Sequence, residues 1–405
     1  MVANVQVAAA HAAPTGRIMR AASMERPRLL DRLAWRDAAI AWIAQRLLIA
    51  PFIYLGHFVL TGHHGSALDE LRSVWLYWDA AHYTGIAQQG YTGLPEAAFY
   101  PLFPLLERAV SLVTGGDVVL AGVIVANVSC LTAFALLRVL AEREAGRSIA
   151  RRTLILVAAF PTSFFFAMAY SESLFLLLSV GVFLALHERR WLLAGGIAAL
   201  AALTRPVGVL LLLPLLIEIA RGMRVTPVGA RWAMLARGVG ALSLPVVGFV
   251  AFNIYVGLHF GAHASTYDAE GGGWGRQFSW PWDGFARATT AALGDGAFIE
   301  RLHASLDIGF TALLCALSIL AIRKLPARYA VYVCATSALV LLTPIHKYDW
   351  AALASNSRFM LVMFPLFWLL ARWSGRPLVA LALAGVSAAL LLLFALTFAA
   401  GTFVA

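Results

Sequence analysis

Charged residues are scarce in this chain. Asp, Glu, Lys and Arg make up only 13% of its 405 residues, hydrophobic residues make up 61%, and the mean hydropathy is +0.79. Soluble domains carry about 25% charged residues, so the composition excludes an ordinary soluble protein and leaves little room for a soluble domain. Cysteine is also scarce: Cys130, Cys315 and Cys334 lie in apolar runs without metal-ligand spacing. We predict that these cysteines pack as small hydrophobic side chains and form neither a disulfide framework nor a metal site.

The N-terminal segment lacks the apolar core of a cleaved signal peptide. An Arg-rich stretch precedes the first apolar run, which covers 39–60. We therefore expect residues 1–38 to form a disordered cytoplasmic tail, and the first span to act as an uncleaved anchor.

Long apolar runs fill the rest of the chain. An apolar helix of about 20 residues crosses a bilayer, and on this basis we predict an all-α polytopic membrane protein with about eleven spans (nine to thirteen) in one domain over 39–400. The predicted spans are 39–60, 117–140, 152–170, 171–187, 191–204, 206–220, 238–258, 305–322, 328–344, 358–371 and 377–400. The short runs 191–204 and 206–220 are either two halves of a hairpin or one helix broken at Thr204-Arg205-Pro206, because proline removes a helix donor.

The charged residues divide unequally between the two predicted sides of the membrane. The side that holds the N-terminus carries 23 of the 31 Lys and Arg but only 7 of the 21 Asp and Glu. The positive-inside rule places that side in the cytoplasm. The net charge of +10 is then a topology signal with membrane lipids as partners, and no nucleic-acid motif accompanies it. The extracytoplasmic loops are predicted at 61–116, 259–304 and 345–357.

The first of these loops places a carboxylate among aromatic side chains. In a short amphipathic helix, predicted over 77–89, Asp79, His82, Tyr83 and Ile86 share one face by their spacing. A poorly solvated Asp79 beside Trp78 is suited to act as a base. The alternatives are a helix cap or a surface carboxylate near an interfacial aromatic belt. His82 is either a phosphate or Asp79 contact, or an ordinary polar loop residue.

Cations occur at three further points of the predicted outer face. Arg205 lies between two apolar runs, where a charge faces a cavity or a partner; it either binds a phosphate or forms a structural pair with an acid such as Glu172. Trp274 and Arg276 suit sugar stacking or lipid headgroup contact, with interfacial anchoring as the alternative. Lys347 and Arg358 flank the last outer loop. Both suit a phosphodiester, although Arg358 at the mouth of a helix can also be a snorkelling residue.

Five motifs occur in order between residues 75 and 367: Trp78-Asp79-Ala80-x-His82 with Gly90-Tyr91 and Phe99-Tyr100-Pro101; Phe160-Pro161-Thr162-Ser163 with Tyr170-Ser171-Glu172-Ser173; Thr204-Arg205-x-x-Gly208; Trp274-Gly275-Arg276 with Pro281-Trp282; and Ser357-Arg358-Phe359 with Phe364-Pro365. Together they resemble the PIG-V family, which takes its name from GPI mannosyltransferase II and has bacterial members. The short loops and the Ala, Leu and Arg content are typical of a bacterial chain, for which a plasma-membrane location is expected.

The resemblance implies a GT-C-type glycosyltransferase with an extracytoplasmic active site. Its donor would be a polyprenyl-phosphate sugar, usually mannose, and no cofactor or metal would be required. Asp79 would deprotonate the acceptor hydroxyl, which attacks the anomeric carbon with inversion. Arg205 and Arg358 would hold the departing phosphate. His82 also matches a position of the family pattern, and Glu172 would be a second acid that assists or orients the first. Lys347 is assigned to the substrate on physical grounds alone.

The acceptor and two competing classes stay open at this point. A lipid-linked glycan, a cell-wall polymer and a protein hydroxyl are all compatible acceptors. A transporter or lipid flippase would place ionisable residues along the spans near the midplane, whereas the acids here gather in the outer loops. An enzyme resembling the protein O-mannosyltransferases or the aminoarabinose transferases would share the fold class, but such families often carry an Asp-Glu pair where this chain has a lone Asp79.

Overall fold

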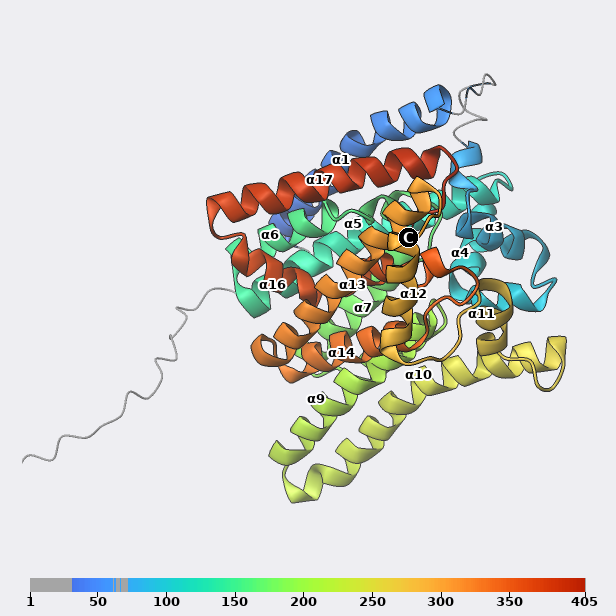
Figure 1. The fold of residues 1–405 in the computed structure, drawn as a ribbon. Coiled ribbons are helices and arrows are strands. Elements are labelled where there is room, and N and C mark those ends of the chain that lie inside the picture. Colours follow the sequence, from blue (N-terminus) through green and yellow to red (C-terminus); the bar gives the residue numbers. More distant parts are fainter. Residues whose placement is uncertain (1–30, 61, 63–65, 67–71, 405) are drawn as a thin grey trace, which may run out of the picture.

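The computed structural model describes residues 31–60, 62, 66 and 72–404, and it is a helical bundle (Figure 1). Within these residues there is no β-strand, and the one isolated bridge joins Arg276 to Ile345. The α-helices are α1 (Arg32–Tyr54), α3 (Asp79–Gln89), α4 (Leu102–Ser111), α5 (Val118–Ala145), α6 (Arg147–Ala158), α7 (Glu172–His187), α8 (Trp191–Ala202), α9 (Leu212–Val225), α10 (Arg231–Phe260), α11 (Thr266–Trp274), α12 (Pro281–Leu293), α13 (Phe298–Lys324), α14 (Ala327–Leu342), α15 (Asn356–Val362), α16 (Pro365–Trp373) and α17 (Pro377–Ala399). Short helical turns cover Leu55–Leu60, Leu94–Ala98, Ser163–Ala167, Pro206–Leu211, Val228–Ala230 and Asp349–Ala351.

The predicted class, an all-α polytopic membrane protein, is confirmed. Six helical segments in the described part of the chain are long and apolar enough to cross a membrane, and a bent pair around Met363 and Phe364 brings the number to seven. The six are Arg32–Leu60, Val118–Ala145, Pro206–Val225, Val228–Phe260, Phe298–Lys324 and Pro377–Ala399. The runs predicted at 171–187, 191–204 and 328–344 are helical but shorter than a full span.

One predicted span is wrong. The run 152–170 is not a single helix, because α6 ends at Ala158 and the chain then turns through Pro161 before a short helical turn at Ser163–Ala167. Proline has no N–H group to continue the helical ladder. The N-terminal boundary also differs: α1 begins at Arg32, with Asp31 as its cap, so the end of the tail predicted over 1–38 is helical. Residues 1–30 lie outside the described residues.

The break predicted at Thr204-Arg205-Pro206 is present, and α8 and α9 are separate helices. Arg205 is extended (φ −152°, ψ 149°), as the residue before a proline prefers. Gly208 then lets the chain turn back closely, since a Cβ at this position would lie 2.2 Å from the carbonyl oxygen of Ala201. The sequence Arg205-Pro206-x-Gly208 is thus a helix break with a tight return.

Small residues bring the helices together. A Cβ on Gly195 in α8 would lie 2.3 Å from the carbonyl oxygen of Ala241 in α10, so the two backbones are in direct contact. Such close approach is typical of membrane helices. The helices α3, α4 and α11 gather at one end of the bundle, away from the turn between α16 and α17 (Figure 1). This end holds most of the polar side chains considered below.

The short helix α11 is tied to this end by buried contacts. Ala269 packs with Tyr100 and Phe252 in one apolar cluster. The Tyr100 hydroxyl donates to Thr266 Oγ1 (3.1 Å), and Thr266 Oγ1 donates to Asn253 Oδ1 on α10 (3.0 Å). The segment around Tyr100, α10 and α11 are therefore positioned as a unit.

Candidate active site

Asp79 is placed by an unusual backbone turn. The residue before it, Trp78, has φ 58° and ψ −121°, which a side chain larger than glycine rarely adopts. This turn makes Asp79 the first residue of α3 and buries its side chain, leaving the residue 6% exposed. A carboxylate at this position is favoured by the partial positive charge of a helix N-terminus.

Asp79 belongs to a buried ion-pair network. Arg358 Nη2 lies 2.5 Å from Asp79 Oδ2, and Arg358 Nε lies 2.7 Å from Glu172 Oε1. Arg205 Nη1 lies 2.5 Å from the same Glu172 oxygen and donates to Ser171 Oγ at 3.2 Å. Two arginines and two carboxylates balance one another, which offsets the desolvation that isolated charges would suffer at this depth.

The network connects elements that are distant in sequence. Asp79 begins α3, Glu172 begins α7, Arg205 occupies the break after α8, and Arg358 lies on α15. The aromatic surroundings expected for Asp79 are present, but its carboxylate is paired with Arg358. The pairing of Arg205 with Glu172, one of the two interpretations open from the sequence, is also present.

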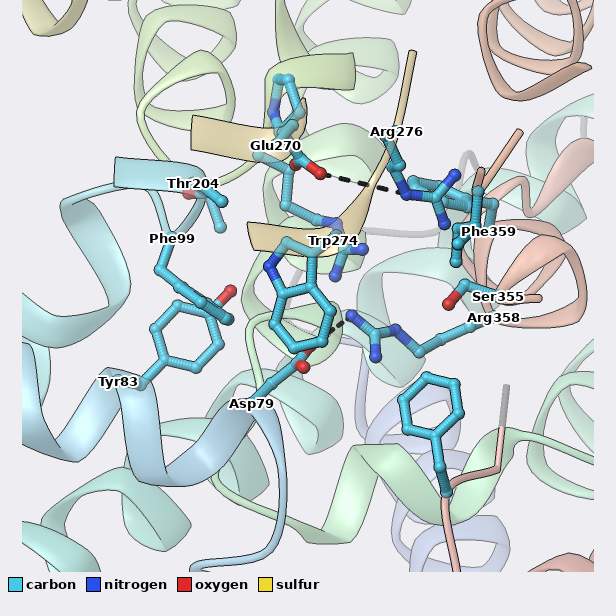
Figure 2. A pocket seen from close by; sticks show the side chains of 15 residues that line it. Asp79, Tyr83, Phe99, Thr204, Glu270, Trp274, Arg276, Ser355, Arg358 and Phe359 are labelled. Carbon is cyan, nitrogen blue, oxygen red and sulfur yellow. Dashed lines mark hydrogen bonds and ion pairs between the residues drawn. The ribbon is translucent and has the colours of Figure 1, made fainter. Parts of the chain in front are cut away.

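A polar cavity lies over this network (Figure 2). The lining residues are Asp79, Tyr83, Ala98, Phe99, Thr204, Arg205, Pro206, Glu270, Trp274, Arg276, Ile345, Ser355, Arg358, Phe359 and Phe403. A mostly apolar cavity adjoins it and shares Pro206, Glu270, Arg276 and Phe359 as walls. The remaining walls of the apolar cavity are Tyr100, Val207, Val209, Leu210, Phe249, Thr266, Tyr267, Leu339, Val340 and Thr343.

Most of the residues predicted for the site meet at the polar cavity. They are Asp79, Tyr83, Arg205, Trp274, Arg276 and Arg358. Glu172 is completely buried and contacts both arginines. Tyr83 donates to Ser171 Oγ at 2.8 Å, which ties α3 to the start of α7.

Three predicted residues lie beside the cavity or away from it. His82 is exposed and stacks on Phe99, with ring centroids 4.6 Å apart. Trp78 lies edge-on to Phe403, at 5.1 Å, behind the cavity wall. Lys347 is placed elsewhere: it lines a separate surface hollow, and its ammonium lies 5.8 Å from the centroid of the Tyr348 ring.

Glu270 is a second acidic residue of the cavity, and it was not among the residues predicted from the sequence. Its side chain is 26% exposed, and its Oε2 lies 3.9 Å from Arg276 Nε. Desolvation in the cavity raises the pKa of the Glu270 carboxyl, an effect that the positive charge of Arg276 partly opposes. A signal was available, because Glu270 precedes Trp274 by one helical turn.

Within the described residues, no group of three or more His, Cys, Asp or Glu side chains is arranged to hold a metal ion. The polar groups of the cavity are instead guanidinium, carboxylate and hydroxyl groups. Such groups bind phosphates and hydroxyls.

Comparison with known proteins agrees with the motifs. Residues 63–215 match the family described as mannosyltransferase (PIG-V). The predicted resemblance to the PIG-V family is confirmed. The GPI mannosyltransferase 2 proteins of two strains of Cryptococcus neoformans var. neoformans serotype D are each 32% identical to this chain over 145 residues, which is 33% of this chain and 34% of the relative.

The chain thus spans about a third of the length of the curated relatives it matches. No solved structure matches it. The PIG-V match includes Asp79, Glu172 and Arg205, whereas Glu270, Trp274, Arg276 and Arg358 lie beyond its end. The PIG-V segment therefore supplies three of the four residues of the ion-pair network, and the 190 residues that follow it supply Arg358 and the other lining residues from Glu270 onward.

Proposed function

We propose that this protein is a membrane glycosyltransferase of the GT-C type, and specifically a mannosyltransferase. It would move a sugar from a polyprenyl-phosphate donor to an acceptor hydroxyl, with inversion at the anomeric carbon. The observation that carries the proposal is the convergence of Asp79, Arg205 and Arg358 on one cavity beside an apolar cavity. The PIG-V match supports mannose as the sugar.

The donor is matched by the two adjoining cavities. A polyprenyl phosphate carries a dianionic or monoanionic head on an apolar chain, so it needs cations next to an apolar wall. Arg205 and Arg358 supply the cations, and the apolar cavity shares a wall with the polar one. Guanidinium groups in a desolvated site stabilise the charge that develops on a departing phosphate.

Asp79 is assigned the role of base. Arg358 bridges Asp79 and Glu172 in the structure. A donor phosphate that binds Arg358 would weaken the Asp79 pair and free its carboxylate for the acceptor hydroxyl. Asp79 would take the hydroxyl proton as the acceptor oxygen bonds to the anomeric carbon, and the bond from that carbon to the phosphate oxygen breaks. Glu172 keeps Arg205 and Arg358 in place.

The proposal includes an orientation. The N-terminus and the basic loops face the cytoplasm, and the cavity opens on the extracytoplasmic side, in a bacterial plasma membrane. The acceptor is a hydroxyl of a lipid-linked glycan, a glycan polymer or a protein.

The test is sugar transfer by the purified full-length chain in lipid nanodiscs. Polyprenyl-phosphate mannose with a radiolabelled sugar and a membrane acceptor extract are supplied to the wild type, Asp79→Asn and Asp283→Asn. Removing a general base lowers the rate by about 10²- to 10⁴-fold, so Asp79→Asn should transfer at least a hundredfold more slowly. Asp283 lies on α12 away from the cavity and is the matched control. Equal transfer by all three proteins would remove Asp79 from the mechanism, and no transfer by the wild type would contradict the proposed activity.

A further inference from the structure

Glu270 is the carboxylate of the cavity that remains available to a ligand. Asp79 and Glu172 each lie within 2.7 Å of an arginine nitrogen, whereas the Arg276 nitrogen nearest to Glu270 is 3.9 Å away. In the part of the chain that the structure describes, no hydrogen bond reaches the Glu270 carboxylate oxygens.

Arg276 is held in place by other partners. Its Nη1 donates to the carbonyl oxygen of Thr343 at 2.9 Å, and its Nη2 donates to that of Ala354 at 3.2 Å. The guanidinium is thereby anchored to the backbone on either side of residues 345–353, and its contact with Glu270 is a long ion pair of 3.9 Å without a hydrogen bond (Figure 2). Glu270 keeps a nearby positive charge without losing its hydrogen-bonding capacity.

Trp274 shares the cavity-facing side of α11 with Glu270. The two residues are four apart on one helix, so their side chains are neighbours. Gly271, Gly272 and Gly273 lie between them and add no side chain to this turn. The indole is fixed by edge-on contacts with His82 and Phe99, each with ring centroids 5.9 Å apart. Both side chains line the polar cavity.

An indole beside a carboxylate that has no hydrogen-bond donor suits a sugar. The apolar C–H face of a hexose packs on an aromatic ring, and its hydroxyls donate hydrogen bonds to a carboxylate. A phosphate would be repelled by the Glu270 carboxylate and attracted to the arginines. The arginines therefore suit the phosphate of a sugar phosphate, and Glu270 suits its sugar. This separation assigns Glu270 to the sugar and not to the phosphate.

We propose that Glu270 and Trp274 form the subsite for the donor sugar, with Glu270 accepting hydrogen bonds from the sugar hydroxyls. This inference rests on the proposed function, because it takes the ligand to be a sugar on a lipid phosphate. It adds a specificity-determining residue from the second outer loop to a site otherwise built from Asp79 and the arginines.

The experiment compares two ligands that differ only by the sugar. Binding of polyprenyl-phosphate mannose and of sugar-free polyprenyl phosphate is measured by microscale thermophoresis with the full chain in nanodiscs. The variants are Glu270→Gln, Glu270→Ala and the control Asp268→Asn. The Asp268 side chain does not line the cavity and accepts a hydrogen bond from the hydroxyl of Ser265, the N-cap of α11. Hydrogen bonds to a charged group predict a loss of about tenfold to a hundredfold for the mannosylated lipid in Glu270→Ala. Glu270→Gln should lose less, and both variants should bind sugar-free polyprenyl phosphate within twofold of the wild type.

The unchanged binding of the sugar-free lipid also shows that the variants are folded. Equal weakening toward both lipids, or no weakening toward the mannosylated one, overturns the subsite. A wild type that transfers mannose while Glu270→Ala binds the mannosylated lipid normally refutes the subsite and leaves the proposed function standing. A wild type that shows the sugar-dependent selectivity, loses it in Glu270→Ala, and transfers nothing refutes the proposed function and supports the subsite.

Discussion

Glu107 on α4 provides a pH-dependent test of the structure. It has no exposed surface, and neither of its carboxylate oxygens has a hydrogen-bond partner among the described residues. It packs so tightly on α5 that a Cβ at Gly122 would lie 2.2 Å from Glu107 Oε1. Burial raises the pKa of the Glu107 carboxyl from 4.5 to about 9. The side chain is therefore protonated in the folded protein at neutral pH.

The size of the pH effect on stability follows from the difference in proton binding by Glu107 between the folded and the unfolded protein. Below pH 4.5 the carboxyl is neutral in both states and the full stability is present. As the pH rises from 4.5 toward 9, the unfolded chain ionises and the folded chain does not, so stability is lost at about 1.4 kcal/mol per pH unit. At pH 7 this amounts to about 3 kcal/mol, and above pH 9 the loss levels off at about 6 kcal/mol.

The assay is thermal unfolding of detergent-purified wild type, Glu107→Gln and the exposed control Asp295→Asn between pH 5 and 9. Glu107→Gln carries no titratable group at this position, so its Tm should rise relative to the wild type as the pH increases. Asp295→Asn should follow the wild-type profile. Parallel pH profiles for the wild type and Glu107→Gln would refute the burial of a protonated acid between α4 and α5.

Three other substitutions test the site and its supports. Glu172→Gln leaves Arg205 and Arg358 buried with one carboxylate fewer, which should destabilise the fold by about 3–5 kcal/mol and abolish transfer; an unchanged Tm in thermal unfolding would show that the network is not structural. Gly208→Ala places a Cβ 2.2 Å from the Ala201 carbonyl oxygen, so it should displace Arg205 and lower transfer at least tenfold, whereas Gly196→Ala, which has open space, should transfer normally. Lys347→Ala should change the transfer rate less than twofold, because Lys347 lies outside the polar cavity; a tenfold loss would place this residue in the substrate path.

The sequence alone was sufficient to predict features that depend on residues close to one another along the chain. Composition and apolar run length determined the membrane class, because the hydrocarbon thickness sets the length of a span. The start of α3 near Asp79 and the break at Arg205-Pro206 followed from local periodicity and from the missing donor of proline. The prediction failed at 152–170 because it relied on hydrophobicity alone, although Pro161 gave the same local signal for a helix break as Pro206.

Tertiary packing decided the partners within the site. Asp79 and Arg358 are 279 residues apart, and no periodicity relates them. Lys347 lies apart from the cavity and Glu270 enters it because of how α11 and the segment 345–357 are anchored, through Thr266 and Arg276. Ion pairs and cavities form between elements that touch only after folding. The sequence could therefore identify Asp79, Arg205 and Arg358 as candidates, while the packing of α3, α7, α11 and α15 determined that they meet and that Glu270 joins them.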